Sequence, residues 1–405
     1  MIVVVALFCC SVAVAGDEPE EEDDLHENTV GGAVGAPVET PVDQPEVPEV
    51  VDAATANRPY SPLSYATAEV LGLDVVFADR CRNAIELIYA RRYKESKAEL
   101  DLLTREYPTT GIGPSGVAVI YQALMFENYD FRYEKQFKLA HESAISQISQ
   151  GQQEPGNDAI ETFLLAGMRG LEAIHKMRRQ DFVGAIGTGL DAVSALAQTK
   201  KAAPKFVDPL LGDGMYQYWR TVIARTSALI PDGADDRAAG KELMKKVEKE
   251  GVLMGPAATL ALAYSYIEER DLRNALARSM YGRQKYPDNV INNMTAGRIL
   301  TSMRRYDDAV RMYEHVLQSA PDNQRSHYHL GVVYSRMSRF PDSEKEYQAY
   351  IAYKDVLPEY RGQAYYRLGL LFQRQKKDVE ARSAFESAVK TSKNEAARKA
   401  LEKMQ

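Results

Sequence analysis

The stretch from Pro287 to Asn323 reads PDNVINNMTAGRILTSMRRYDDAVRMYEHVLQSAPDN, and its pattern decides the fold. Apolar side chains recur in it at spacings of three and four residues, which is typical of amphipathic helices. Pro-Asp-Asn stands at both ends of the stretch, where it stops a helix and turns the chain. The pattern predicts two helices joined by a tight turn and bounded by these stops.

The same pattern recurs in four blocks, at 256–289, 290–323, 324–358 and 362–394. Each block has a small residue in its first helix and a second small residue twelve positions later. Two antiparallel helices approach closely only where both have small side chains, and aromatic rings then fill the wedge between one pair and the next. The small residues are Ala263, Gly297, Gly331 and Gly369, then Ala275, Ala309, Ser343 and Ala381, and the aromatic residues are Tyr313, Tyr347 and Phe385.

In these positions the four blocks resemble the tetratricopeptide repeat. Two departures are Ser279, where the family has an aromatic residue, and Lys393, where proline is usual. The resemblance implies an all-α fold, a right-handed α-α superhelix whose first helices line a concave groove. It also implies a scaffold or adaptor that binds other proteins.

Upstream of this array, residues 58–255 are predicted to form degenerate helical repeats. The stretch 90–100 looks like the second half of one repeat, and 167–196 looks like a further helical pair. The Gly-rich turn and aromatic run at 211–220 resemble those of Iml2-like helical-repeat proteins, a resemblance that brings no catalytic residue. A C-terminal capping helix is expected over residues 395–405.

The first fifteen residues are a short apolar run that ends in Ala13-Val14-Ala15, and they predict a signal peptide cleaved before Gly16. The run is shorter than a membrane span. We therefore expect a protein exported across the inner membrane to the periplasm or cell envelope. An outer-membrane lipoprotein acylated at Cys10 is the disfavoured alternative, because Cys9 precedes it instead of Gly, Ala or Ser, and membrane association would require that acylation.

Residues 16–57 predict a disordered, acidic, Pro-rich tether. They contain thirteen Asp and Glu and no Lys or Arg, in a chain with 57 acidic and 50 basic residues and a formal charge of −7. Such a composition cannot bury enough apolar surface to fold. The body from Arg58 onward is left mildly basic, an excess too small to favour nucleic-acid binding in an exported chain.

The glycines of Gly111-Ile112-Gly113-Pro114-Ser115-Gly116 match a dinucleotide-binding motif, yet no strand is expected before them. We interpret them as a loop before a capped helix. Cys81 is interpreted as an unreactive helix residue. The spacing of His315, His327 and His329 does not suit a metal site. The sequence thus predicts no cofactor, no metal and no enzyme.

Arginine and tyrosine are expected to dominate the groove, a composition that suits an acidic protein or extended peptide as partner. Packing between repeats remains the alternative for any one tyrosine. The Lys and Asn clamp of chaperone-binding family members is not present at the corresponding positions. The expected partner-binding residues are Tyr264, Met294, Arg298, Arg325, Tyr328, Arg336, Tyr366 and Arg374.

A different class of function remains as an alternative, an envelope hydrolase or wall-processing accessory enzyme. Its site would lie between the irregular and the regular repeats. Asp208, Asp213 and Trp219 are the candidate residues.

Overall fold

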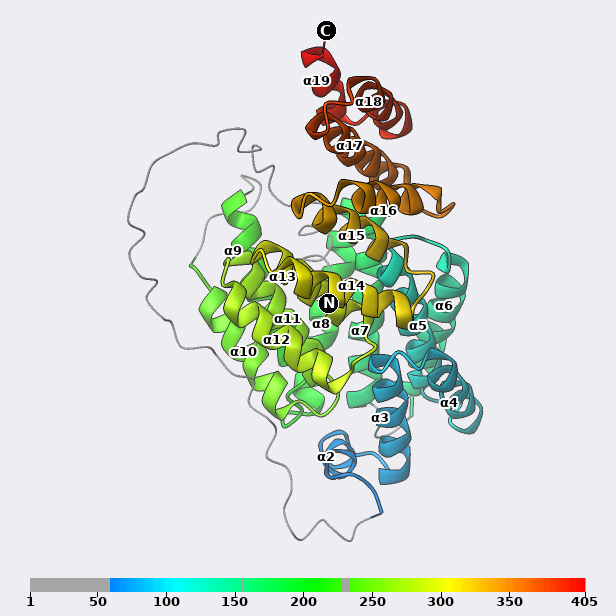
Figure 1. Cartoon of the computed structure of the whole chain (residues 1–405). Helices are drawn as coiled ribbons and strands as arrows, with labels where there is room; N and C mark the ends of the chain where they lie inside the picture. The colour runs from blue at the N-terminus through cyan, green and yellow to red at the C-terminus, as the bar shows by residue number, and fades with distance from the viewer. Residues whose placement is uncertain (1–58, 155, 157, 227–233, 405) are drawn as a thin grey trace, which may run out of the picture. The chain divides into compact units, whose positions relative to one another are not determined.

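The computed structural model describes residues 59–154, 156, 158–226 and 234–404 (Figure 1). This part of the chain contains eighteen α-helices and no strand, so the predicted all-α fold is confirmed for it. The predicted signal peptide, the acidic tether and Cys10 lie outside the described residues. No helix among the described residues combines the length and the hydropathy needed to cross a bilayer.

The helices follow one another with short connections. They are α2 (Pro62–Leu71), α3 (Val75–Tyr89), α4 (Tyr93–Glu106), α5 (Ile112–Asn128), α6 (Glu134–Gly151), α7 (Asp158–Arg178), α8 (Phe182–Ala202), α9 (Leu210–Thr226), α10 (Arg237–Glu250), α11 (Gly255–Glu268), α12 (Leu272–Lys285), α13 (Val290–Ser302), α14 (Tyr306–Ser319), α15 (Gln324–Arg336), α16 (Phe340–Ala352), α17 (Pro358–Arg374), α18 (Asp378–Ser392) and α19 (Glu395–Lys403).

The chain divides into two compact units, each built from separate stretches of sequence. Unit 1 comprises the described residues of 59–87, 94–116 and 141–282. Unit 2 comprises 88–93, 117–140 and 283–404. The regular repeats of unit 2 therefore share a core with two short segments from much earlier in the chain.

A residue in the left-handed conformation ends the first helix of each pair. Arg270, Arg304 and Ser338 have φ values of 59°, 58° and 57° and follow one another at 34-residue intervals. The N–H of the next residue then bonds a carbonyl five positions back, as from Arg339 to Tyr334 at 2.9 Å, which is the Schellman arrangement. Lys376 has the same conformation in the regular pair α17/α18. Arg91 and Gln180 also have it, so a left-handed residue follows the first helix in the looser pairs α3/α4 and α7/α8 too.

Glycine allows the two helices of a regular pair to touch. A Cβ on Gly369 would lie 2.4 Å from a ring carbon of Phe385, and one on Gly331 would lie 2.8 Å from Tyr347. Ser343 Oγ also donates to the Gly331 carbonyl at 2.7 Å. The twelve-residue spacing of small residues thus corresponds to a direct contact within one pair.

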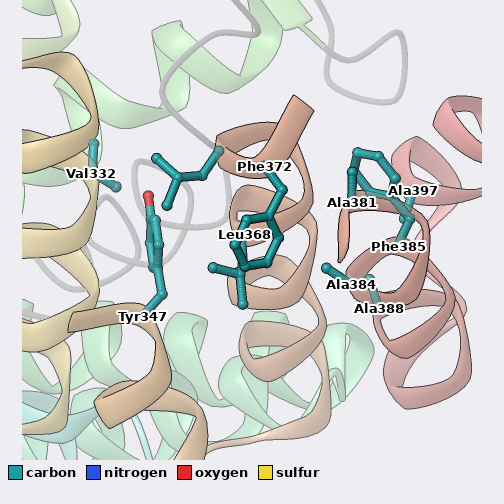
Figure 2. Packing of buried hydrophobic residues seen from close by; sticks show 10 residues of the cluster. Val332, Tyr347, Leu368, Phe372, Ala381, Ala384, Phe385, Ala388 and Ala397 are labelled. Atoms are coloured by element: carbon teal, nitrogen blue, oxygen red, sulfur yellow. The ribbon is translucent and has the colours of Figure 1, made fainter. Parts of the chain in front are cut away.

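The aromatic rings also join one pair to the next. Tyr347 of α16 shares a buried cluster with Leu368 of α17, which continues to Phe385 of α18 and Ala397 of α19. Figure 2 shows Leu368 and Phe372 between Tyr347 on one side and Phe385 with its neighbouring alanines on the other. The rings therefore pack within their own pair as well as in the wedge beside it.

Unit 1 also contains close helix contacts outside the regular array. A Cβ on Gly214 of α9 would lie 2.6 Å from the carbonyl oxygen of Gly240 in α10. The α3/α4 pair repeats the serine contact of the regular repeats, since Ser96 Oγ donates to the Ala84 carbonyl at 2.8 Å. The upstream helices are thus paired by the same small-residue chemistry.

Candidate partner-binding face of the repeats

All eight residues expected to bind a partner lie on first helices of their pairs, namely α11, α13, α15 and α17. Two of them lie in the core. Tyr264 of unit 1 is 4% exposed, and Met294 of unit 2 is 3% exposed. The Met294 sulfur accepts a hydrogen bond from Ser326 Oγ at 3.5 Å. The other six predicted side chains are half-buried or exposed.

The Pro-Asp-Asn stops do more than end helices. Asn289 caps α13 by accepting from the Asn292 N–H at 3.0 Å, and its amide donates to the Tyr89 carbonyl at 2.9 Å. Asn323 caps α15 and donates to the Glu127 carbonyl at 2.8 Å. Each asparagine thus fixes the start of a repeat and holds one of the earlier segments of unit 2.

Arg325, predicted to bind a partner, is already used within unit 2. Its guanidinium donates to the Phe126 carbonyl at 3.3 Å and lies 4.3 Å from the centre of the Tyr129 ring. These contacts occupy part of its planar fork and one of its stacking faces. Residues at the C-terminal end of α5 thus cover part of the Arg325 guanidinium, which was predicted to bind a partner.

A buried ion pair lies beside this contact and had no counterpart in the sequence pattern. The carboxylate of Glu127, with a side chain 2% exposed, accepts from Arg91 at 3.0 Å and from the Tyr93 hydroxyl at 2.8 Å. Arg91 also donates to the Ser319 carbonyl at 2.9 Å. Removing one partner of such a pair leaves a buried charge uncompensated, so the cluster fixes how the early segments pack.

Tyr328 belongs to an aromatic cluster within the repeats. Its ring centre lies 5.3 Å from that of Tyr350, 5.4 Å from His329 and 5.9 Å from Tyr347. Tyr366 similarly lies 5.9 Å from the Phe385 ring. Both tyrosines are half-buried, so packing within their own helix pairs accounts for part of each ring.

His329 of α15, whose spacing from the other histidines does not suit a metal site, lies one helical turn after Arg325. The His329 ring stacks on Tyr313 at 5.3 Å. Removal from water lowers the pKa of His329 well below its ordinary value, and the charges of Arg325 and Arg298 lower it further. Both guanidinium groups therefore oppose protonation of His329.

The remaining arginines lie further along the array. Arg336 is half-buried at the end of α15. Arg374 is exposed at the end of α17, where it donates to the Ser335 carbonyl and hydroxyl at 3.1 Å each and lies 5.3 Å from the centre of the Phe340 ring. The guanidinium of Arg374 thus remains exposed to solvent.

The glycine motif at 111–116 belongs to helix packing. It follows α4 and opens α5, and a Cβ on Gly116 would lie 2.5 Å from Leu100. The N–H of Gly111 donates to the buried carboxylate of Glu161 at 3.1 Å. The predicted loop before a helix is wrong for five of the six residues, since 112–116 form the first turn of α5. Burial raises the pKa of the Cys81 thiol, which opposes formation of a reactive thiolate.

The candidate hydrolase residues have structural partners. Asp208 is fully buried and accepts from the N–H groups of Val252, Leu253 and Met254 at 2.9, 2.7 and 2.5 Å. Asp213 pairs with Lys200 at 2.6 Å, and Trp219 is buried. Among the described residues, no three His, Cys, Asp or Glu side chains gather closely enough to hold a metal ion. These contacts do not favour the hydrolase alternative.

The profile of the tetratricopeptide-repeat family matches residues 294–355 and 332–397. These residues are tetratricopeptide repeats. The match covers the last three of the four expected blocks and lies outside 211–220, so the Iml2-like resemblance there stays a prediction. A comparison with curated protein sequences gave no match.

Three solved structures that are similar to this chain are each 13% identical to it. A human IFIT1 dimer with PPP-AAAA has a TM-score of 0.37, covering 77% of this chain and 58% of its own. A human IFIT1 dimer with m7Gppp-AAAA has a TM-score of 0.45, covering 84% and 74%. The P58(IPK) TPR domain has a TM-score of 0.24, covering 82% and 97%. This chain thus spans little more than half the length of the first of these.

Proposed function

We propose that this protein is a non-catalytic scaffold that holds an acidic protein or extended peptide on its first-helix face. We define that face as the exposed and half-buried side chains of α13, α15 and α17, namely Arg298, Tyr328, Arg336, Tyr366 and Arg374. In a right-handed tetratricopeptide superhelix the first helices line the concave side, where a peptide can contact several repeats at once.

The arginines on three successive first helices carry the proposal. Arg298 of α13 and Arg336 of α15 are half-buried, and Arg374 of α17 is exposed. Arg325 contributes less, because its guanidinium already contacts Phe126 and Tyr129. A positive site of this kind attracts carboxylates, and arginine binds them through two parallel hydrogen bonds. Half-buried tyrosines beside it add rigid contact area.

Affinity capture with charge-reversed variants tests this function. The full-length protein is purified from its own cells after crosslinking, and recovered partners are quantified by mass spectrometry. Arg298→Glu with Arg336→Glu is expected to lower specific recovery at least tenfold. The matched control is Arg311→Glu on the second helix α14, where Arg311 pairs with Asp308. Equal recovery from the face variant and from wild type would remove this face from the function.

Export to the cell envelope is the second part of the proposal, and it rests on the apolar run and Ala13-Val14-Ala15. Cell fractionation with mass measurement of the intact protein tests it. We expect an envelope protein whose first residue is Gly16. A protein found in the cytoplasm with Met1 in place would contradict export and leave the binding face to be judged separately.

A further inference from the structure

Helix α8 presents four large apolar side chains to solvent. The exposed fractions are 60% for Phe182, 85% for Val183, 67% for Ile186 and 60% for Leu190. An exposed apolar residue that stands alone is ordinary on a protein surface, whereas a contiguous patch marks an interaction site. Four such residues within nine positions of one helix form a contiguous patch.

These residues share one face of α8. Residues three, four and seven apart lie on the same side of a helix, and Val183, Ile186 and Leu190 have that spacing. The face continues through Ser194 and Ala197, which are also exposed. The opposite side, with Ala185, Ala192 and Leu196, is buried in unit 1. We call the exposed side, from Phe182 to Ala197, the α8 stripe.

Glycine makes the stripe suited to a second helix. Gly187 lies on the stripe with nothing within 4 Å of the place where its Cβ would be. Glycine in a helix interior costs about 0.5–1 kcal/mol relative to alanine. No contact within the described part of the chain requires the missing Cβ, but a helix backbone that approached from outside would.

The sizes of the side chains along the stripe identify the occupant. The large residues stand in the first half of α8, and small ones stand in the second half. If two copies of α8 cross antiparallel with Leu190 at the two-fold axis, Val183 of one meets Ala197 of the other, and Ile186 meets Ser194. The two Leu190 side chains meet at the axis, and on both sides of them large side chains face small ones, which favours close helix packing.

We propose that the α8 stripe is the contact between two copies of this chain, packed antiparallel about Leu190. The stripe offers on the order of 400–500 Å² of apolar side-chain surface, so two copies bury roughly 1,000 Å² in all, which is the low end for a specific interface. The dimer is therefore weak and depends on concentration, with a Kd on the order of micromolar. This contact is separate from the first-helix face.

Analytical ultracentrifugation of the full chain tests the dimer. Over roughly 1 to 100 µM, wild type is expected to pass from monomer to dimer. Ile186→Asp is expected to raise the dissociation constant at least tenfold. The matched control is Val379→Asp, because Val379 is an isolated exposed valine on α18 with an exposed fraction of 81%. Circular dichroism shows whether each variant keeps its helices. Wild type that stays monomeric, or a dimer that Ile186→Asp does not weaken, overturns the proposal.

Disulfide trapping tests the antiparallel register. Val183→Cys and Ala197→Cys are made separately and oxidised alone and as an equal mixture, with wild type as the background for its natural thiols. We expect the mixture to give at least several times more crosslinked dimer than either variant alone. Crosslinking of each variant to itself as efficiently as to the other overturns the arrangement. Vesicle flotation of a monomeric wild type would instead assign the stripe to a membrane surface and overturn the dimer.

Discussion

Arg325 of the third tetratricopeptide block stacks on Tyr129, with 4.3 Å between the guanidinium carbon and the centre of the ring. The two residues are 196 positions apart in the sequence, and the same guanidinium donates to the Phe126 carbonyl. A cation that the repeat pattern assigns to a partner thus has a ligand inside its own unit. This relationship gives Arg325 a structural role within unit 2.

Arg325→Ala is therefore expected to lower the free energy of unfolding by about 1–3 kcal/mol, since it removes a partly buried cation–π contact and a charged hydrogen bond. The control is Arg311→Ala on α14, where an exposed guanidinium pairs with Asp308, and it should change stability by no more than about 0.5 kcal/mol. Chemical denaturation measures both variants. Equal stability losses in the two variants would contradict the structural role of Arg325.

Gly369→Ala should destabilise the protein by about 1–3 kcal/mol, because its Cβ would overlap the Phe385 ring and overpack the contact. The control is Gly167→Ala in α7, where nothing lies within 4 Å of the new Cβ. That substitution should stabilise the protein by about 0.5–1 kcal/mol, because alanine lowers the conformational entropy of the unfolded chain. Thermal unfolding compares the two, and shifts of the same sign would argue against the close approach at Gly369.

Ser338→Gly should raise the free energy of unfolding by about 0.5–1 kcal/mol. Ser338 has a φ of 57°, where a Cβ is strained and glycine is not. Gly72, with a φ of 67°, supplies the reverse control, and Gly72→Ala should cost about 1 kcal/mol. Denaturant midpoints report both changes. Destabilisation by Ser338→Gly would mean that the serine side chain outweighs the backbone strain.

Stability should fall as the pH rises through the titration of Glu161. Burial raises the pKa of Glu161 from 4.5 to about 7. The hydrogen bond from the Gly111 N–H lowers that pKa, but by less than burial raises it. Between these values the folded state holds a proton that the unfolded state has released, so stability is greater at the acidic end and declines toward neutrality. Relative to Glu161→Gln, wild type should lose stability between pH 5 and pH 7.5. Parallel pH profiles for the two proteins would contradict this shift.

The repeat architecture could be predicted because its contacts recur at fixed, short spacings. Gly331, Ser343 and Tyr347 follow one another by twelve and four positions, and these intervals correspond to real contacts. The left-handed turns gave less signal, since glycine usually marks that conformation and none of Arg270, Arg304 and Ser338 is glycine. Local pattern thus identified the pairs better than the details of their turns.

The candidate site was harder to predict. Burial of Met294 had a local signal, because it lies three residues before Gly297 on the side where the second helix packs. The contacts of Arg325 and Glu127 had no local signal in the sequence. Arg325 and Phe126 are 199 positions apart, and Glu127 and Arg91 are 36 apart. The periodicity of the repeat array carries no information on segments outside it.

Asn289 donates a hydrogen bond to the carbonyl of Tyr89, and Asn323 donates one to the carbonyl of Glu127. Both carbonyls lie far earlier in the sequence and are therefore synthesised long before the asparagines. Unit 2 therefore cannot close until nearly all of the protein has left the ribosome. At roughly 5–20 residues per second, the 200 residues between Tyr89 and Asn289 take on the order of 10–40 s to synthesise. Throughout that delay the ends of α3 and α5 lack their permanent neighbours, so the nascent chain offers chaperones a long opportunity to bind there before the repeats arrive.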